Sequence, residues 1–115
     1  MNRLFLLVLL LMTAPTMSAQ EAHFDSEHAQ WIASVIDSIH TIKPGMTRAD
    51  VLRVFTTEGG LSNRRHRTYV YKECPYIKVT VEFKPVGDPN NLVTEMPTDR
   101  VVSISAPFLQ YSVGD

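Results

Sequence analysis

The sequence predicts an α+β fold in which two N-terminal helices pack on a three-stranded antiparallel β-meander. Apolar residues recur at helical spacing in residues 26–42 and again after residue 47, and strict apolar–polar alternation follows in residues 77–84. The helical segments precede all the strand segments, without βαβ alternation, so we expect an antiparallel sheet.

The first segment is predicted to be a signal peptide, residues 1–19. Arg3 supplies a positive charge before a short apolar run at residues 4–12, and small and polar residues follow up to a cleavage region at Ser18 or Ala19. The apolar run is about half the roughly 20 residues that span a bilayer, which favours cleavage over an anchor. Residues 20–115 are then expected to form a single exported domain, periplasmic or extracellular, with no stable membrane insertion.

Composition narrows the classes of function. The chain has 11 Lys and Arg against 12 Asp and Glu, a formal net charge of -1, which argues against nucleic-acid or acidic-lipid binding. Cys74 is the only cysteine, so no intramolecular disulfide can form. Its thiol is either redox-active or intermolecularly bonded or, as the E-C-P-Y context favours, a small, partly buried hydrophobe at a turn.

The first predicted helix covers residues 26–42 and is amphipathic. Asp25 or Ser26 can cap its N-terminus. Pro44 ends it, because the residue before a proline is pushed out of the α region. Its apolar stripe consists of Trp31, Ile32, Val35, Ile36 and Ile39.

The string KPGMTRADVLRVF, residues 43–55, predicts the start of a second helix. Thr47 is expected to be the N-cap, and Asp50 three residues later can reach back to it in a capping box. Gly45 lets the chain reverse without a Cβ clash. The helix is expected to end at the glycine pair 59–60 and to bury Val51, Leu52 and Phe55.

The three predicted strands are residues 67–72, 77–84 and 100–106. The first two are joined by a turn at Cys74-Pro75 and form a hairpin. A polar loop leads to the third strand, and the residues after Pro107 are expected to be an extended edge or tail.

The string SNRRHR, residues 62–67, is the densest charge feature of the chain. Arginine side chains bind carboxylates and phosphates in a fixed forked geometry, so Arg64, Arg65 and Arg67 are candidate contacts for an acidic partner or an anionic ligand. The alternative is a solvated connection that protects the start of a strand from edge pairing.

Tyr69 and Tyr71 share one face of the first predicted strand. They either join the core under the helices or form an exposed aromatic surface, which suits protein binding because it offers contact area at small entropic cost. The candidate partner-binding residues are therefore Arg64, Arg65, Arg67, Tyr69 and Tyr71.

The sequence contains no motif of catalysis or cofactor binding of the types G-x-S-x-G, H-E-x-x-H, Gly-rich phosphate loop or C-x-x-C. The oxygen-rich loop at residues 88–91, with Glu95 and Asp99 nearby, lacks the glycine and the ligand spacing of an EF-hand. We therefore expect a non-catalytic protein without cofactor or metal. The histidines also lack the spacing of a metal site: His23, His28, His40 and His66.

The string IKPGMTRADVLRVF resembles the segment between the two helices of the SmpA/OmlA type of small outer-membrane lipoprotein, a component of the β-barrel assembly machinery. The β-lactamase inhibitory proteins use the same two-helix, three-strand unit. The resemblance implies a non-enzymatic envelope protein that binds other proteins. The chain departs from the family because it has no cysteine that could be lipidated at the mature N-terminus, and TEGGLS replaces leucine-glycine-x-proline. The matching positions are Ile42, Gly45, Met46, Thr47, Val51 and, more loosely, Phe55.

The predicted function is an exported, non-catalytic protein that binds a protein partner in the cell envelope, through the outer sheet face or the Arg64–Arg67 region. The alternative is a domain that binds or senses a small anionic ligand with the same arginines.

Overall fold

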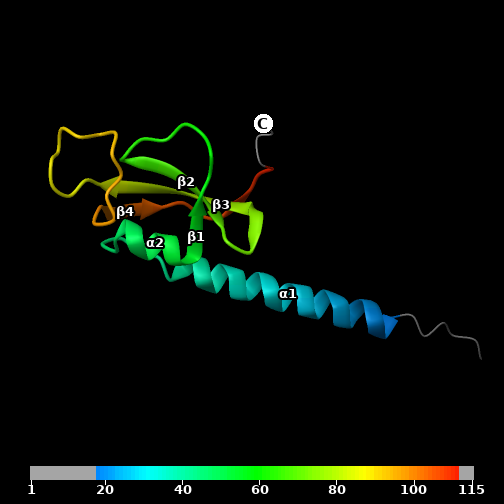
Figure 1. Cartoon of the computed structure of the whole chain (residues 1–115). Helices are drawn as coiled ribbons and strands as arrows, with labels where there is room; N and C mark the ends of the chain where they lie inside the picture. The colour runs from blue at the N-terminus through cyan, green and yellow to red at the C-terminus, as the bar shows by residue number, and fades with distance from the viewer. Residues whose placement is uncertain (1–17, 112–115) are drawn as a thin grey trace, which may run out of the picture. The chain divides into compact units, whose positions relative to one another are not determined.

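The computed structural model of the chain describes residues 18–111, with side chains described from residue 25 (Figure 1). Most of the predicted signal peptide lies outside the described residues. The chain divides into two compact units, one up to Ala33 and one from Ser34 onward, and each is described by itself. The elements are α1 (Ser18–His40), α2 (Arg48–Val54), β1 (Phe55–Thr57), β2 (His66–Tyr71), β3 (Cys74–Lys84), β4 (Arg100–Ile104) and β5 (Phe108–Leu109).

The predicted fold class is wrong, because residues 18–111 combine two helices with a five-stranded antiparallel sheet in which strands dominate. The strand order is β1-β2-β3-β4 (Figure 1). β5 also pairs with β3. β3 is 11 residues long and has room for two partners on one edge. β4 pairs with the C-terminal end of β3, where Phe83 lies opposite Val101. β5 pairs nearer the middle of β3, where Ile77 lies opposite Leu109.

The additional strand β1 arises because α2 ends at Val54 and not at the glycine pair 59–60. Phe55 leaves the helix with extended dihedral angles, φ -117 and ψ 160. Phe55 and the two threonines after it are aromatic and β-branched residues, which favour a strand, and they pair with β2 so that Phe55 lies opposite Tyr71. Val51 and Phe55 are buried as predicted, whereas Leu52 is 40% exposed.

The second additional strand, β5, is the segment after Pro107 that the sequence predicts to be an extended edge or tail. It forms two residues of ladder with β3, and Gln110 extends the contact by donating its backbone N–H to the Tyr76 carbonyl at 3.0 Å. Beside it, the Lys78 ammonium is fully buried on the outer sheet face and pairs with Glu58. The polar face predicted for β3 is therefore partly covered.

The core of the unit from Ser34 onward lies on the opposite face of the sheet. Cys74 is half-buried and packs at the margin of this core, next to a turn, which confirms the predicted partial burial. The alternating residues of β3 supply the centre of this core. Its buried members are Val35, Ile39, Ile42, Val51, Phe55, Tyr69, Tyr71, Val79, Val81, Phe83 and Val101.

Helix α1 begins at Ser18, earlier than the predicted start at Ser26. In the unit from Ser34 onward, Val35 and Ile39 are buried, but Ile36 is 37% exposed. In the unit up to Ala33, Trp31 and Ile32 are also exposed. The buried stripe of α1 is therefore narrower than the apolar stripe in its sequence. No helix among residues 18–111 is long and apolar enough to cross a membrane.

The predicted capping box at the start of α2 is confirmed. The Asp50 N–H donates to the Thr47 hydroxyl at 3.2 Å, and the Thr47 N–H donates to the Asp50 carboxylate at 3.0 Å. The chain reverses at Gly45, whose φ of +91 is a backbone conformation that residues with a Cβ rarely adopt. The Gly45 N–H then donates to the Val101 carbonyl at 2.8 Å, and the Val101 N–H donates to the Met46 carbonyl at 2.8 Å. These bonds hold the start of α2 against β4.

Candidate functional site

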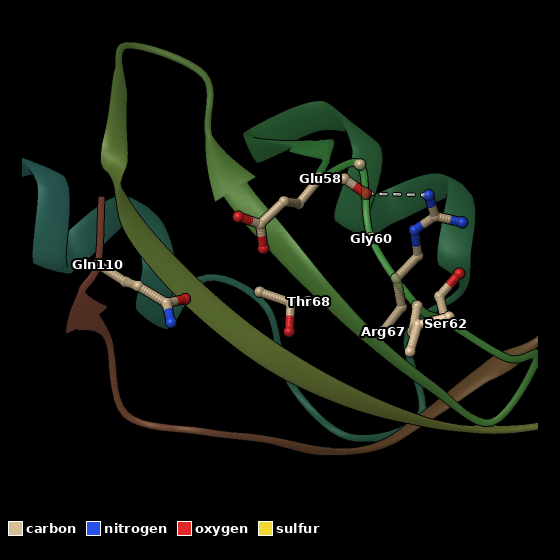
Figure 2. A pocket seen from close by; sticks show the side chains of 8 residues that line it. Glu58, Gly60, Ser62, Arg67, Thr68 and Gln110 are labelled. Atoms are coloured by element: carbon tan, nitrogen blue, oxygen red, sulfur yellow. Dashed lines mark hydrogen bonds between the residues drawn. The ribbon is translucent and has the colours of Figure 1, made fainter. Parts of the chain in front are cut away.

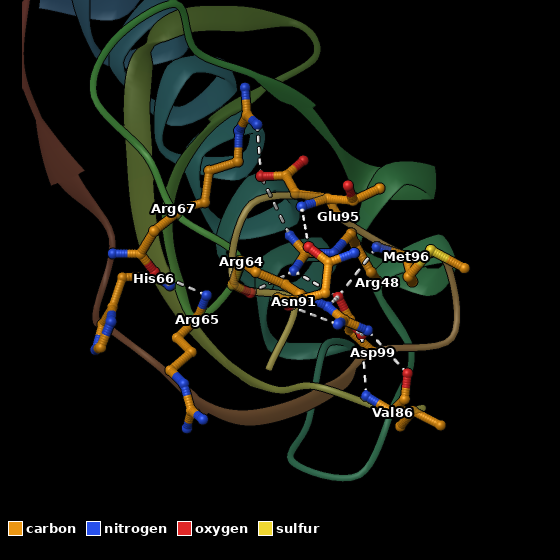
Figure 3. Close-up of polar contacts among 12 residues, drawn as sticks. Arg48, Arg64, Arg65, His66, Arg67, Val86, Asn91, Glu95, Met96 and Asp99 are labelled. Carbon is orange, nitrogen blue, oxygen red and sulfur yellow. Dashed lines mark hydrogen bonds and ion pairs between the residues drawn. The ribbon is translucent and has the colours of Figure 1, made fainter. Parts of the chain in front are cut away.

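Three charged side chains from distant parts of the chain meet inside the molecule, and we call them the Asp99 cluster (Figure 3). Arg48 opens α2, Arg64 precedes β2 and Asp99 precedes β4. They are 3%, 1% and 0% exposed, respectively. A backbone hydrogen bond brings the start of α2 next to Asp99, because the Arg48 N–H donates to the Asp99 carbonyl at 2.8 Å.

The Asp99 carboxylate accepts hydrogen bonds from every side. Arg64 donates from Nη2 to Oδ1 at 2.8 Å and from Nε to Oδ2 at 3.1 Å. Arg48 Nη2 donates to Oδ2 at 3.0 Å. The backbone N–H groups of Val86 and Met96 each donate at 3.1 Å. Burying a carboxylate is costly unless it is paired and hydrogen-bonded, and here both conditions are met.

These contacts determine the protonation state of Asp99. Burial raises the pKa of its carboxyl, but the hydrogen bonds from Arg64, from the Met96 and Val86 backbone and from Arg48 outweigh burial. The pKa of Asp99 is therefore held well below its ordinary value. The pKa of Arg64 is raised, chiefly by its hydrogen bonds to Asp99. Both groups are charged at neutral pH.

The lowered pKa of Asp99 predicts acid sensitivity. Its ionised form stabilises the fold above the unfolded pKa of about 3.9, and this contribution is lost as the pH falls below that value. We expect the free energy of unfolding to decrease from about pH 5 downward, by up to about 1.4 kcal/mol per pH unit for each proton taken up. Urea titrations at several pH values measure this slope.

Asp50 provides a matched control for the acid sensitivity. The Thr47 backbone hydrogen bond lowers the pKa of Asp50 in the same direction, but Asp50 is only partly buried. Asp99→Asn should therefore remove more of the pH slope than Asp50→Asn does. A slope that is unchanged in Asp99→Asn would contradict the role of Asp99.

The Arg64 side chain also holds the long loop between β3 and β4, residues 85–99. Its Nη2 donates to the Val86 carbonyl at 2.8 Å, and its Nη1 donates to the carbonyls of Asp88 at 3.0 Å and Asn91 at 2.8 Å. The Arg64 backbone N–H donates to the Leu92 carbonyl at 3.1 Å. A single residue thus fixes the first half of the 85–99 loop, while Asp99 fixes its end.

Arg48 connects the same cluster to the core. Its guanidinium carbon lies 3.8 Å from the centre of the Phe83 ring, and its Nη1 donates to the Tyr69 hydroxyl at 3.0 Å. Its Nη2 also donates to the Arg64 carbonyl at 2.6 Å. Burial raises the pKa of Tyr69, so its hydroxyl stays protonated. The cluster therefore joins α2, β2, β3 and the loop.

A second carboxylate, that of Glu95, extends the cluster towards the surface. Arg67 Nη1 lies 2.6 Å from Glu95 Oε1, and Arg48 Nη1 lies 3.6 Å from the same oxygen. Two carboxylates thus face three guanidinium groups, because Arg64 is the third. All five side chains have charged partners, and the residues that the structure describes include no group that could hold a metal ion.

The candidate residues from the sequence do not form one binding surface. Arg64, Tyr69 and Tyr71 are buried, because the first binds Asp99 and the two tyrosines face the core. Arg67 is mostly covered by its pair with Glu95. Only Arg65 is exposed, and its side chain points away from Asp99 (Figure 3). The arginines that an anionic ligand would need are therefore already bound within the protein.

Sequence reasoning missed Arg48, which has no place in the predicted site, and it assigned Asp99 only to a possible loop ligand set. One signal was available for Arg48. A cation in the first turn of a helix opposes the helix dipole, which favours anions there. Such a cation is expected to have a compensating partner, and Asp99 is that partner.

The 85–99 loop displays apolar side chains on its outer side. Val93 is 88% exposed, and Leu92 is 45% exposed. Met96 and Val86 are also exposed. The Asn91 side chain shapes the tip, because its Oδ1 accepts from the backbone N–H groups of Val93 at 3.2 Å and Thr94 at 3.0 Å. The apolar tip, Leu92 and Val93, is therefore carried by a loop backbone that is held by hydrogen bonds from Arg64 and Asn91.

Comparisons of the chain with protein-family models, with curated proteins and with solved structures find no match. The resemblance to the SmpA/OmlA lipoproteins stays a prediction.

Proposed function

We propose that the chain is an exported, non-catalytic module that binds a protein partner in the cell envelope through the 85–99 loop. One observation carries the proposal: the loop is anchored from inside by the buried Asp99 cluster and displays Leu92 and Val93 to solvent. Export is proposed from the charged and apolar segments at residues 1–12.

The length and anchoring of the loop support a binding role. Loops as long as residues 85–99 are uncommon in compact domains and are usually either functional or disordered. This loop is fixed at its start by Val86, in its middle by Asn91 and at its end by Asp99. A loop already held in one conformation loses less entropy on binding, so more of the contact energy appears as affinity.

The means of anchoring supports the same role. A buried cluster of charges is an inefficient way to gain stability, because well-packed apolar residues of similar volume often do as well or better. What the Asp99 cluster provides is a fixed geometry, since each guanidinium nitrogen of Arg64 has a defined acceptor. A surface that must match a partner benefits from that fixed geometry.

The chemistry of the tip indicates a protein as the partner. Val93 and Leu92 expose apolar side chains, and contact with a protein surface would remove this apolar area from water, which favours binding. The two carboxylates in the second half of the loop, Glu95 and Asp99, are bound by arginines, so neither is free for proton transfer. This arrangement suits recognition better than catalysis.

The test replaces Leu92 and Val93 and leaves the Asp99 cluster unchanged. The double variant Leu92→Asp with Val93→Asp should retain the melting temperature of the parent chain, because both side chains are exposed. Photo-crosslinking in cell-envelope extract is then compared between the parent, the loop variant and Val102→Asp. Val102 is a matched control on β4, with 47% exposure.

The proposal predicts one protein that is crosslinked by the parent and by Val102→Asp but is reduced at least about tenfold with the loop variant, the effect of roughly 1.4 kcal/mol of lost contact. Equal crosslinking by the parent and the loop variant would overturn the assignment of the interface to the 85–99 loop.

A further inference from the structure

Two exposed cations flank the 85–99 loop. Lys84 is the last residue of β3, directly before the loop, and Arg100 is the first residue of β4, directly after it (Figure 1). The two strands are antiparallel, and their register places Lys84 opposite Arg100. Both residues are exposed. We call them the Lys84–Arg100 pair.

The Lys84–Arg100 pair lies on the face of the sheet opposite the core. Phe83, the neighbour of Lys84, is 2% exposed and faces the core, and successive side chains of a strand alternate between the two faces. Directly opposite residues of an antiparallel pair share a face, with Cβ atoms roughly 4.5–5.5 Å apart. Two positive charges are therefore held side by side, an arrangement that destabilises a sheet.

No ion pair offsets this repulsion within residues 25–111. Glu82 lies on the same face two residues before Lys84, but its carboxylate lies 3.6 Å from His66 Nε2 and accepts a hydrogen bond from Ser103 at 3.2 Å. The ion pairs among the described side chains include neither Lys84 nor Arg100.

Arg100 is held in position without being neutralised. Its Nη1 donates to the Gly45 carbonyl at 2.9 Å. The pKa of Asp50 is lowered chiefly by its hydrogen bonds with Thr47, and Arg100 makes only a minor contribution. The Asp50 carboxylate is used to cap α2 and to pair with Arg53 at 3.4 Å. The charge of Arg100 therefore stays available to a partner.

Other cations of the sheet have partners inside the protein. Arg67 donates to the Glu95 carboxylate at 2.6 Å and to the Glu58 carbonyl at 3.3 Å (Figure 2). Lys78 is buried and pairs with Glu58. Repulsion at the base of the loop is thus a local departure from the pattern of the sheet, and such departures are expected at functional sites.

We propose that the Lys84–Arg100 pair contacts an acidic group of the same protein partner that receives the apolar tip, Leu92 and Val93. The inference rests on the proposed function and adds the charge of the partner. A carboxylate placed between the two cations would remove their repulsion. The whole chain has a formal net charge of -1, so attraction of an acidic partner has to come from a local feature such as this pair.

The variant Lys84→Glu separates a role in binding from a role in folding. The introduced carboxylate would face Arg100, and opposite charges across two strands stabilise a sheet, so the melting temperature should not fall. Photo-crosslinking of the partner in envelope extract, at about 50 mM salt, should fall at least about fivefold, because charges at an interface control the association rate. A variant that loses stability and crosslinking together would overturn the proposal, since a structural role explains both losses.

Lys72→Glu is the matched control. Lys72 is an exposed lysine in the turn before β3, at the end of the strand away from the loop, and its replacement changes the net charge by the same amount. It should leave crosslinking unchanged. Raising the salt from about 50 mM to about 500 mM should weaken crosslinking by the parent more than by Lys84→Glu. Equal losses in Lys72→Glu and Lys84→Glu would contradict a specific contact.

A defined probe tests the same chemistry without the extract. The acetylated and amidated peptides Leu-Leu-Glu-Glu and Leu-Leu-Gln-Gln differ only in charge. At millimolar concentration and low salt, the acidic peptide should shift the NMR signals of the Lys84 and Arg100 amides, and it should bind Lys84→Glu at least about fivefold more weakly. Equal shifts by both peptides would contradict the proposal. Binding of phosphatidylglycerol vesicles without binding of the acidic peptide would overturn it in favour of a lipid surface.

The loop and the Lys84–Arg100 pair can fail separately. If Leu92→Asp with Val93→Asp reduces crosslinking and Lys84→Glu does not, the interface lies at the loop but the inferred acidic contact is wrong. If the loop variant crosslinks as the parent does, the proposed function itself is wrong, and the inference falls with it.

Discussion

Asp99→Asn is expected to lower the free energy of unfolding by about 3–5 kcal/mol, the range for a buried charge left without its partner. The asparagine side chain has a similar size, so it leaves no cavity, but it cannot neutralise two guanidinium groups. Arg64 and Arg48 would remain 1% and 3% exposed without a carboxylate between them. One of the amide hydrogens would also face an arginine donor, so a hydrogen bond is lost together with the charge.

Urea unfolding of Asp99→Asn measures the loss, with Arg65→Gln as the control. Arg65 belongs to the same arginine-rich segment but is exposed and lies away from the cluster, so its replacement should change stability by no more than about 0.5 kcal/mol. Hydrogen exchange should locate the damage in the 85–99 loop, which Asp99 fixes through Val86 and Met96. A stability within about 1 kcal/mol of the parent would show that the cluster does not hold the fold.

The contrast between Arg64 and Arg65 shows what the sequence can and cannot predict. Charge density identified the segment, but side-chain direction separates the buried Arg64 from the exposed Arg65, the next residue in the chain. Arg64 meets Asp99 across 35 positions of sequence, and Arg48 meets it across 51. Such partners depend on how the elements pack, so a local pattern cannot show them.

Predictions that depend on interactions between residues close in sequence are confirmed. The capping box at Thr47 and Asp50 is confirmed, because both of its hydrogen bonds lie within one turn. The alternation in β3 also gives the right core residues, with Val79 and Val81 fully buried. Lys78 on the opposite face was expected to be solvated, but Glu58 and the segment after β5 cover it. That cover comes from residues far away in the chain.

The error in the fold class has a similar origin. Val51 and Phe55 are four residues apart, so helical spacing explains both, and the glycine pair 59–60 offered a plausible helix end. The same two residues are equally buried when the helix stops at Val54 and Phe55 begins a strand. Only the pairing with β2 decides between the two states, and strand pairing is a non-local interaction.

The position of Phe55 leads to the second large expected effect. Phe55→Ala should lower the free energy of unfolding by about 3–5 kcal/mol, as expected for a fully buried phenylalanine. The Phe55 ring packs edge to face against Tyr71, with 6.3 Å between the ring centres, and its side chain is 0% exposed. Alanine would leave a cavity between α2 and the sheet and would remove this aromatic contact.

Leu52→Ala is the matched comparison, because a helix running to residue 59 would bury Leu52 together with Phe55. In the structure Leu52 is 40% exposed, so its truncation should cost less than about 1 kcal/mol. Urea unfolding of the two variants therefore distinguishes the strand β1 from a longer helix. Similar losses for Leu52→Ala and Phe55→Ala would favour the longer helix, because only that helix turns both side chains towards the core.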